Sequence, residues 1–108
     1  MKIPERLKVG GHWYKIVCPH GFTERGDRNA DHDPGMKTIR IDVFDSWSHQ
    51  KKPDSSIAVS FLHELLHACD FQTGNRLFID QDGEAKIEAF SEALYQVLHD
   101  NKLKFFDD

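Results

Sequence analysis

Three residues in the stretch SFLHELLHACD, which begins at Ser60, combine side-chain types and a spacing that could do chemistry: His63, Glu64 and His67. Residues four apart lie one above the other on one face of a helix, so both imidazoles can bind the same metal ion. Glu64 is rotated away from that ion and is better placed to act on a water there than to bind the metal. The HExxH spacing therefore predicts a zinc site in which Glu64 is the catalytic base.

The helix that must carry this motif is predicted to begin near Pro53 and to end before Gly74. Its apolar residues cover most of the circumference and predict a buried helix: Ile57, Phe61, Leu62, Leu65, Leu66 and Cys69, the last as a packing thiol. Its polar residues gather in one narrow stripe: Ser60, His63, Glu64, His67 and Asp70. Isolated charge is costly to bury, and a metal ion would partner this stripe. An ordinary helix with surface histidines is the competing interpretation, which the surrounding leucines disfavour.

A catalytic zinc usually has three protein ligands and one water, so a third ligand is expected elsewhere in the chain. A second helix is predicted from about Asp82 to about His99, where apolar residues recur at helical spacing: Ile87, Phe90, Leu94, Val97 and Leu98. Glu84, Glu88 and Glu92 lie successively further from this apolar face, which makes Glu84 the first choice. Glu88 would bind the metal in its place or accept the free N–H of a ligand imidazole. The alternative is that all three glutamates are surface residues without a role in metal binding. Further candidates for the third ligand are the other histidines: His12, His20, His32, His49 and His99.

The segments before these helices predict a small antiparallel sheet. Arg6 to Val9 and His12 to Val17 flank two glycines and read as a hairpin. Cys18 to Gly35 is rich in Gly, Pro, Asp and Asn and predicts a loop. Lys37 to Asp42 alternates polar and apolar residues and predicts a short strand with Ile39 and Ile41 on its buried face. If the HExxH site acts on peptides, this strand is expected at an exposed sheet edge that could bind an extended peptide. We therefore expect an α+β fold, with the sheet followed by two core helices, in a single domain spanning residues 1–108.

Composition narrows the classes of partner. The 108 residues carry a formal net charge of -4 and no basic cluster, which argues against nucleic acid or an anionic membrane as a partner. No signal peptide and no membrane-spanning run is recognisable in the sequence. The two cysteines, Cys18 and Cys69, are too few for a disulfide framework and are expected to be free thiols. These features predict a cytoplasmic protein.

The motif and its downstream helix also resemble a known family. HELLH followed by EAKIEAFSEAL is similar to the minimal gluzincin metallopeptidases, particularly the ImmA/IrrE-like and small phage-associated zincin-like groups. In those proteins the downstream helix reads approximately E-x-x-A-[ND]-x-F-A, and its first glutamate binds zinc. Phe90 and Ser91 fall on the F-A pair and Glu84 on the ligand, whereas Ile87 and Glu88 replace the A-[ND] pair. HELLH is the strongly specific part of this resemblance.

The resemblance implies a zincin-like fold and a zinc-dependent metallopeptidase acting on a peptide or protein. Zn²⁺ would be held by His63, His67 and Glu84, and Glu64 would assist the attack of a zinc-bound water on the peptide carbonyl. The alternative is a non-catalytic zinc-binding regulatory or interaction protein with the same fold. Glu64 favours the enzyme, because a site that only binds zinc has no need of a general base.

Overall fold

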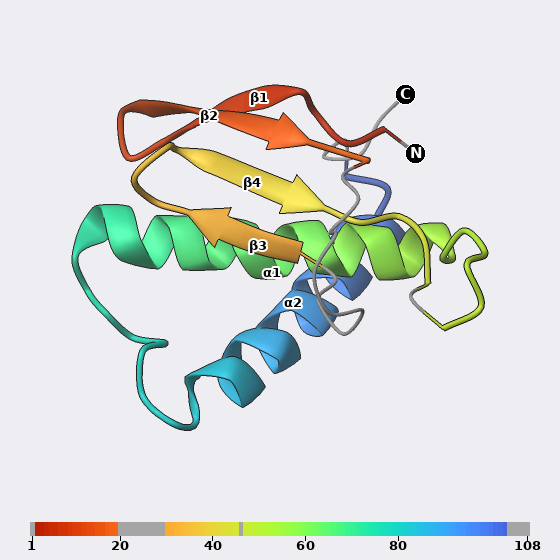
Figure 1. The fold of residues 1–108 in the computed structure, drawn as a ribbon. Coiled ribbons are helices and arrows are strands. Elements are labelled where there is room, and N and C mark those ends of the chain that lie inside the picture. The colour runs from red at the N-terminus through yellow and green to blue at the C-terminus, as the bar shows by residue number, and fades with distance from the viewer. Residues whose placement is uncertain (1, 20–29, 46, 104–108) are drawn as a thin grey trace.

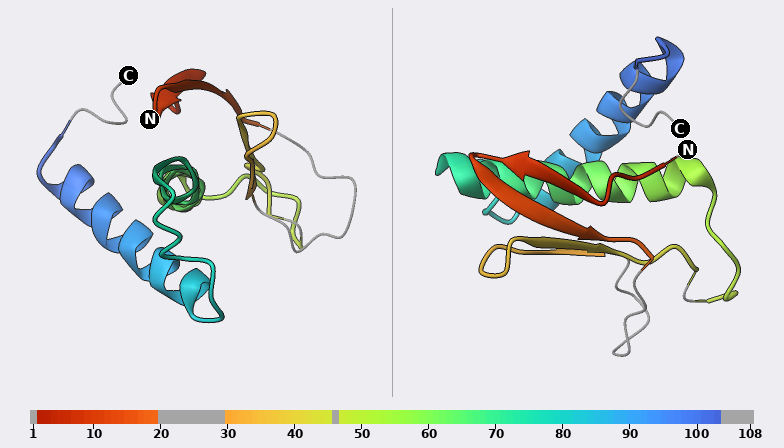
Figure 2. Two further views of the ribbon diagram at one scale, coloured as in Figure 1. Left: turned by 90° about the vertical axis from the view of Figure 1, so that its left-hand side faces the viewer. Right: turned by 90° about the horizontal axis from the view of Figure 1, so that it is seen from above.

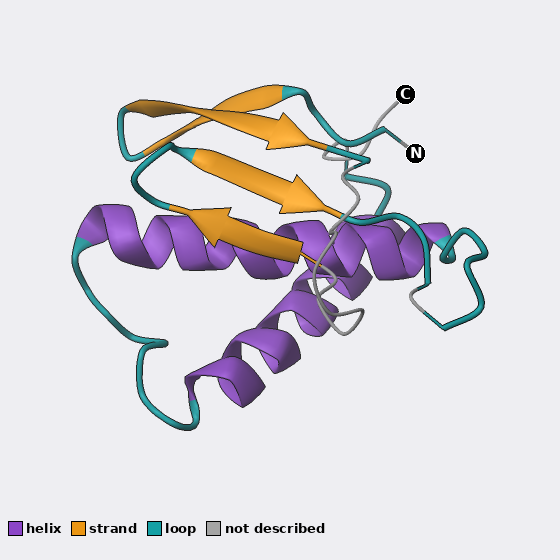
Figure 3. Ribbon diagram, in the orientation of Figure 1, coloured by secondary structure: helices purple, strands orange, loops and turns teal. Residues whose placement is uncertain are grey.

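Four strands and two helices form the part of the chain that the computed structural model describes, residues 2–19, 30–45 and 47–103. In chain order they are β1 (Arg6–Val9), β2 (His12–Val17), β3 (Ala30–Asp33), β4 (Thr38–Ile41), α1 (Asp54–Thr73) and α2 (Gly83–Asp100) (Figure 1). The strands form one sheet, α1 packs against the sheet, and α2 packs against α1 (Figure 3). The predicted α+β arrangement of a small sheet followed by two helices is confirmed.

The sheet has the strand order β1-β2-β4-β3, and its pairing is mixed. β1 and β2 form the expected antiparallel hairpin, and β3 and β4 form a second one, but β2 and β4 run parallel. The prediction of a purely antiparallel sheet is therefore wrong in this one pairing. Parallel neighbours require a crossover, and here the chain passes from β2 to the far edge of the sheet before β4 returns between β2 and β3.

Two sequence predictions about the strands need correction. The predicted loop from Cys18 to Gly35 contains the strand β3, and residues 20–29 of that loop lie outside the described part of the chain. The predicted edge strand, Lys37 to Asp42, is instead the internal strand β4, and β3 occupies the edge. Ile39 and Ile41 are fully buried, which suits an internal strand, whereas the polar sequence of β3 suits an edge.

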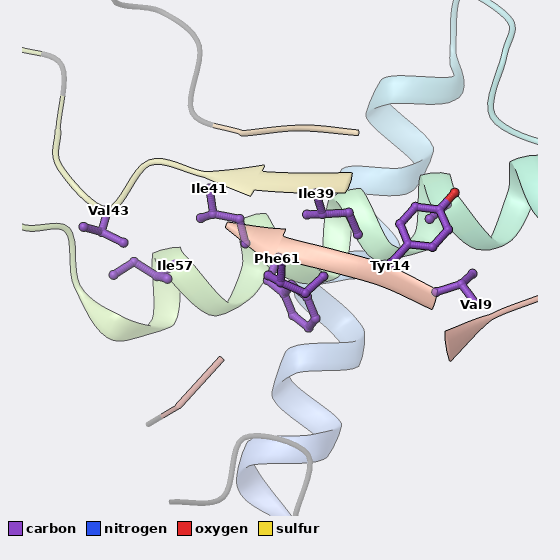
Figure 4. Close-up of a cluster of buried hydrophobic side chains, with 9 residues drawn as sticks. Val9, Tyr14, Ile39, Ile41, Val43, Ile57 and Phe61 are labelled. Atoms are coloured by element: carbon purple, nitrogen blue, oxygen red, sulfur yellow. The ribbon is translucent and has the colours of Figure 1, made fainter. Parts of the chain in front are cut away.

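The core lies between the sheet and α1. Tyr14 and Ile39 from the sheet meet Phe61 from α1, and all three side chains are fully buried (Figure 4). Burying an apolar side chain of this size stabilises the fold by about 1.5–3 kcal/mol. This packing fixes α1 along its length against β1, β3 and β4. The core thereby sets the position of every residue of the HExxH motif relative to the sheet.

The bounds predicted for the first helix are confirmed. α1 begins directly after Pro53 and ends at Gly74, which adopts the left-handed conformation with φ 74° and donates its N–H to the carbonyl of Phe71. The predicted burial of Cys69 is wrong, since this residue is exposed. Cys69 lies between the buried Ala68 and Asp70, so it occupies the exposed side of a turn whose other side is covered.

The second helix also has the predicted bounds, but of its predicted apolar face only Ile87 is fully buried. Ile87 and Ser91 are fully buried, whereas Phe90, Leu94 and Val97 are 60%, 36% and 44% exposed. The prediction that these three residues face the core is therefore wrong. The small Ser91 lets the helices approach closely, and its hydroxyl donates to the carbonyl of Ile87 at 2.6 Å, so the buried polar group is paired. None of the described helices is long and apolar enough to cross a membrane.

Candidate metal centre

The middle of α1 presents the two histidines of the motif on one side of the helix. His63 and His67 lie one turn apart, and their ring centroids are separated by 5.0 Å. Their side chains are 12% and 24% exposed, so both imidazoles are partly shielded from water. The helical repeat alone produces this pairing, which is why the spacing could predict it.

Glu84 reaches the same place from the first turn of α2. One carboxylate oxygen, Oε2, lies 3.1 Å from Nε2 of His63, and the other, Oε1, lies 2.6 Å from Nε2 of His67. The side chain of Glu84 is 71% exposed, so its stem faces solvent while its oxygens face the imidazoles. The structure thus brings together the three residues that the sequence predicts as metal ligands.

The connection between the helices holds the start of α2 in place. Asp70 is buried and accepts hydrogen bonds from the backbone N–H groups of Leu77 at 2.8 Å and Phe78 at 3.1 Å. A Cβ on Gly83 would lie 2.1 Å from the carbonyl oxygen of Phe78, so only glycine fits at the start of α2. Asp70 and Gly83 therefore fix the chain that delivers Glu84. The sequence placed Asp70 in the polar stripe of the helix, and no sequence signal revealed its partners.

Glu88 contacts the other nitrogen of His63, with 2.9 Å between its Oε2 and Nδ1. Both ring nitrogens of His63 therefore face carboxylate oxygens, which offer only lone pairs. A neutral imidazole carries one N–H and can satisfy one such contact. An imidazolium would donate to both carboxylates, whereas a neutral ring whose N–H at Nδ1 donates to Glu88 leaves at Nε2 a lone pair that could bind a metal ion beside Glu84.

The donor set fits zinc. The ligand atoms of His63, His67 and Glu84 all lie within 4.8 Å of one another. Ligand atoms around a tetrahedral zinc stand about 3.3 Å apart, because each bond to the metal is about 2.0–2.1 Å long. The nitrogen–oxygen separations of 3.1 and 2.6 Å are within an ångström of that spacing, so small side-chain movements would admit the ion. Two imidazoles and one carboxylate are also the donors that catalytic zinc commonly uses.

Glu64 points into the same site and is partly buried. Burial raises the pKa of its carboxyl to about 7, with His63 opposing this shift and the carboxylates of Glu84, Asp31 and Glu88 adding to it. A carboxyl with a pKa near neutrality can both accept and release a proton under ordinary conditions. In the metal-free site the Glu64 carboxyl therefore exchanges its proton near neutral pH.

An open pocket of about 410 Å³ gives access to these residues. Its walls come from β3, α1 and the start of α2: Ala30, Asp31, His32, His63, Glu64, His67 and Glu84. Asp31 forms an ion pair with Arg40 on the neighbouring strand, where Nε of Arg40 donates to Oδ1 at 2.7 Å and a second guanidinium nitrogen contacts Oδ2. The edge strand β3 thus forms one wall of the pocket, whereas the sequence analysis had placed the sheet edge at Lys37–Asp42.

His32 is the site neighbour whose position the sequence left open. Its Nε2 lies 3.0 Å from the hydroxyl of the buried Tyr14, and that hydroxyl accepts a hydrogen bond from Gln72 at 3.0 Å. Burial, followed by the nearby His67, lowers the pKa of His32 and favours the neutral ring. His32 is therefore a wall of the pocket whose Nε2 is engaged by Tyr14.

The remaining candidates do not join the cluster. Within the described residues, His63, His67 and Glu84 form the group that could hold a metal ion, and this group does not include His12, His49, His99 or Glu92. His20 lies outside the described residues. Glu92 is exposed on α2. Comparison with protein-family models, with curated proteins and with solved structures gave no match.

Proposed function

We propose that this protein is a zinc-dependent metallopeptidase of the minimal gluzincin type, with Zn²⁺ held by His63, His67 and Glu84. The observation that carries the proposal is the convergence of two imidazole nitrogens and a carboxylate from a separate helix beside Glu64, within one open pocket. Metal ligands alone would support a binding site. A partly buried carboxyl with a pKa near 7 beside them supports catalysis.

Each residue has a role that follows from its position. When bound, zinc supplies a Lewis acid that polarises a carbonyl and lowers the pKa of water. Glu64 accepts the proton of the attacking water on a carboxylate oxygen and passes it to the leaving amine. Glu88 accepts the Nδ1–H of His63, which fixes the tautomer and turns the Nε2 lone pair toward the metal. Asp70 and Gly83 keep Glu84 within reach of both imidazoles.

The edge of the sheet suggests how a peptide would bind. β3 is the last strand in the sheet order, and its residues line the pocket beside Glu64. An extended peptide can add to such an edge through backbone hydrogen bonds, which place one of its carbonyls over the neighbouring site. We therefore assign β3 as the strand that would hold a peptide or protein substrate.

We place the protein in the cytoplasm as part of the same proposal. Cys18 and Cys69 are both free thiols. Free cysteines are typical of reducing compartments, where disulfides do not persist.

Cleavage of casein and of a peptide library by the zinc-loaded protein tests the proposal. We expect cleavage by the wild type, loss of at least about a thousandfold in rate for Glu64→Gln, and unchanged zinc binding in that variant. Glu92→Gln is the matched control, because it makes the same chemical change on an exposed glutamate outside the cluster. Equal zinc binding by wild type and Glu64→Gln without cleavage by either would instead identify a zinc-binding regulatory or interaction protein.

A further inference from the structure

The outer side of α2 carries a regular stripe of exposed residues. They follow one another in steps of four, three, four and three: Lys86, Phe90, Ala93, Val97 and Asp100. This spacing keeps a continuous seam on one side of a helix and is the spacing by which two helices pack together. Among the described elements α2 contacts only α1, and Figure 2 shows it on the side of α1 away from the sheet. The stripe is exposed, and two of its residues, Phe90 and Lys86, contact Phe78 and Asp80 in the connection before α2.

The centre of the stripe is apolar. Phe90 is 60% exposed and Val97 is 44% exposed, and the exposed Ala93 lies between them. Phe78 meets the edge of the Phe90 ring, with 6.2 Å between ring centroids, and supports the ring from one side. Two large apolar side chains flanking a small one form a surface into which another helix can pack closely.

The two ends of the stripe carry opposite charges at equal distances from its centre. Lys86 lies seven residues before Ala93 and Asp100 lies seven residues after it, which is about 10.5 Å along the helix in each direction. If a second α2 lies antiparallel with Ala93 on the two-fold axis, each Lys86 meets an Asp100 of the other copy. The same arrangement brings each Phe90 beside a Val97 of the other copy, with an offset of one residue, about 1.5 Å along the helix. A parallel arrangement would instead bring Lys86 against Lys86.

The existing partners of these charges are weak. Nζ of Lys86 lies 3.8 Å from Asp80, at the limit of an ion pair, and both side chains are more than half exposed. Asp100 accepts a hydrogen bond from Gln96 within the same helix and contacts the adjacent His99, also at the surface. Exposed pairs of this kind contribute little to stability, so both charges can exchange partners at small cost.

We propose that a second copy of this chain docks on this stripe, with the two α2 helices antiparallel and related by a two-fold axis at Ala93. The interface is isologous, because the same residues meet from both sides. Its five-residue seam is smaller than a standard stable interface, so we expect a dissociation constant on the order of 10–100 µM. Glu84 lies roughly 160° around the helix from the stripe, so docking leaves the candidate metal centre open. The dimer is independent of the proposed function.

Sedimentation velocity between about 5 and about 300 µM tests the proposal, because self-association depends on concentration. We expect the wild type to shift from monomer to dimer over this range. Lys86→Asp and Asp100→Lys should each weaken the dimer about tenfold, since each change places like charges at both ends of the interface. The double variant, which exchanges the two charges, should recover most of the wild-type affinity. Glu92→Lys reverses a charge outside the stripe and should leave the affinity unchanged.

Phe90→Ala provides a test that does not depend on charge. Loss of this side chain should weaken the dimer at least about tenfold, because each copy contributes one Phe90 to the centre of the interface. Circular dichroism of every variant establishes that the chain still folds. A wild type that stays monomeric at about 300 µM, or a dimer that tolerates the single charge reversals, would overturn the proposal. Failure of the double variant to recover would equally rule out the antiparallel register.

Discussion

The metal-free wild-type protein should lose stability as the pH rises from about 5 to about 8, and replacing Glu64 with glutamine should abolish this loss. Burial raises the pKa of the Glu64 carboxyl from the ordinary value of 4.5 to about 7 in the folded protein. Between these values the folded state holds a proton that the unfolded state has released. The free energy of unfolding therefore falls as pH rises through this window, and it levels off once both states are ionised.

The magnitude follows from the two pKa values. The difference between 4.5 and about 7 corresponds to about 3 kcal/mol of unfolding free energy at neutral pH and above. Glutamine has nearly the same shape as glutamate and does not ionise, so the Glu64→Gln variant lacks this pH dependence. Urea unfolding at a series of pH values, with a chelator present and tryptophan fluorescence as the signal, measures the difference between the two proteins.

One result of comparing wild type with Glu64→Gln would contradict the raised pKa of Glu64. If both proteins lose the same free energy of unfolding between pH about 5 and about 8, Glu64 ionises in the folded state as it does in water. The burial argument for a general base at this position would then fail. Glu92→Gln serves as the control and should follow the wild type, because Glu92 is exposed.

Three further predictions concern the residues that build the site. Glu88→Gln should weaken zinc binding about 10- to 100-fold in a competition with a chromophoric chelator, because His63 loses a carboxylate partner; no change would show that the contact is unimportant. Asp70→Ala should lower the free energy of unfolding by about 1–3 kcal/mol in urea titrations, because the N–H groups of Leu77 and Phe78 lose their acceptor. The same variant should bind zinc more weakly. Normal zinc affinity would show that Asp70 does not position Glu84. Phe61→Ala should cost about 3–5 kcal/mol by calorimetry or urea unfolding, and a smaller loss would mean that the core between α1 and the sheet closes over the gap.

The parts of the fold that depend on local sequence could be predicted. The bounds of both helices follow from apolar periodicity and from Gly74, whose left-handed conformation ends α1. The pairing of His63 with His67 needs only the helical repeat, so their shared face followed from spacing. Glu84 could be ranked first among the glutamates because its angle on the second helix places it closest to the apolar side.

The parts that depend on tertiary contacts could not be predicted. β3 has the sequence ADHD, whose three polar residues give no strand signal, and it forms because β4 offers it a partner. The insertion of β4 between β2 and β3 is likewise a property of the whole sheet. α2 carries more apolar residues than α1 can cover, and contact with α1 selects Ile87 and Ser91 while Phe90 stays exposed. The role of Asp70 arises from a connection seven residues away.

X-ray absorption at the zinc edge, on protein loaded with one equivalent of Zn²⁺, tests the central claim most directly. The proposed site predicts a first shell of nitrogen and oxygen at about 2.0–2.1 Å with the scattering pattern of two imidazoles, and one imidazole fewer in His67→Ala. A shell containing sulfur at about 2.3 Å would assign the zinc to Cys18 or Cys69. A shell without imidazole, or one unchanged in His67→Ala, would contradict a centre built from His63, His67 and Glu84.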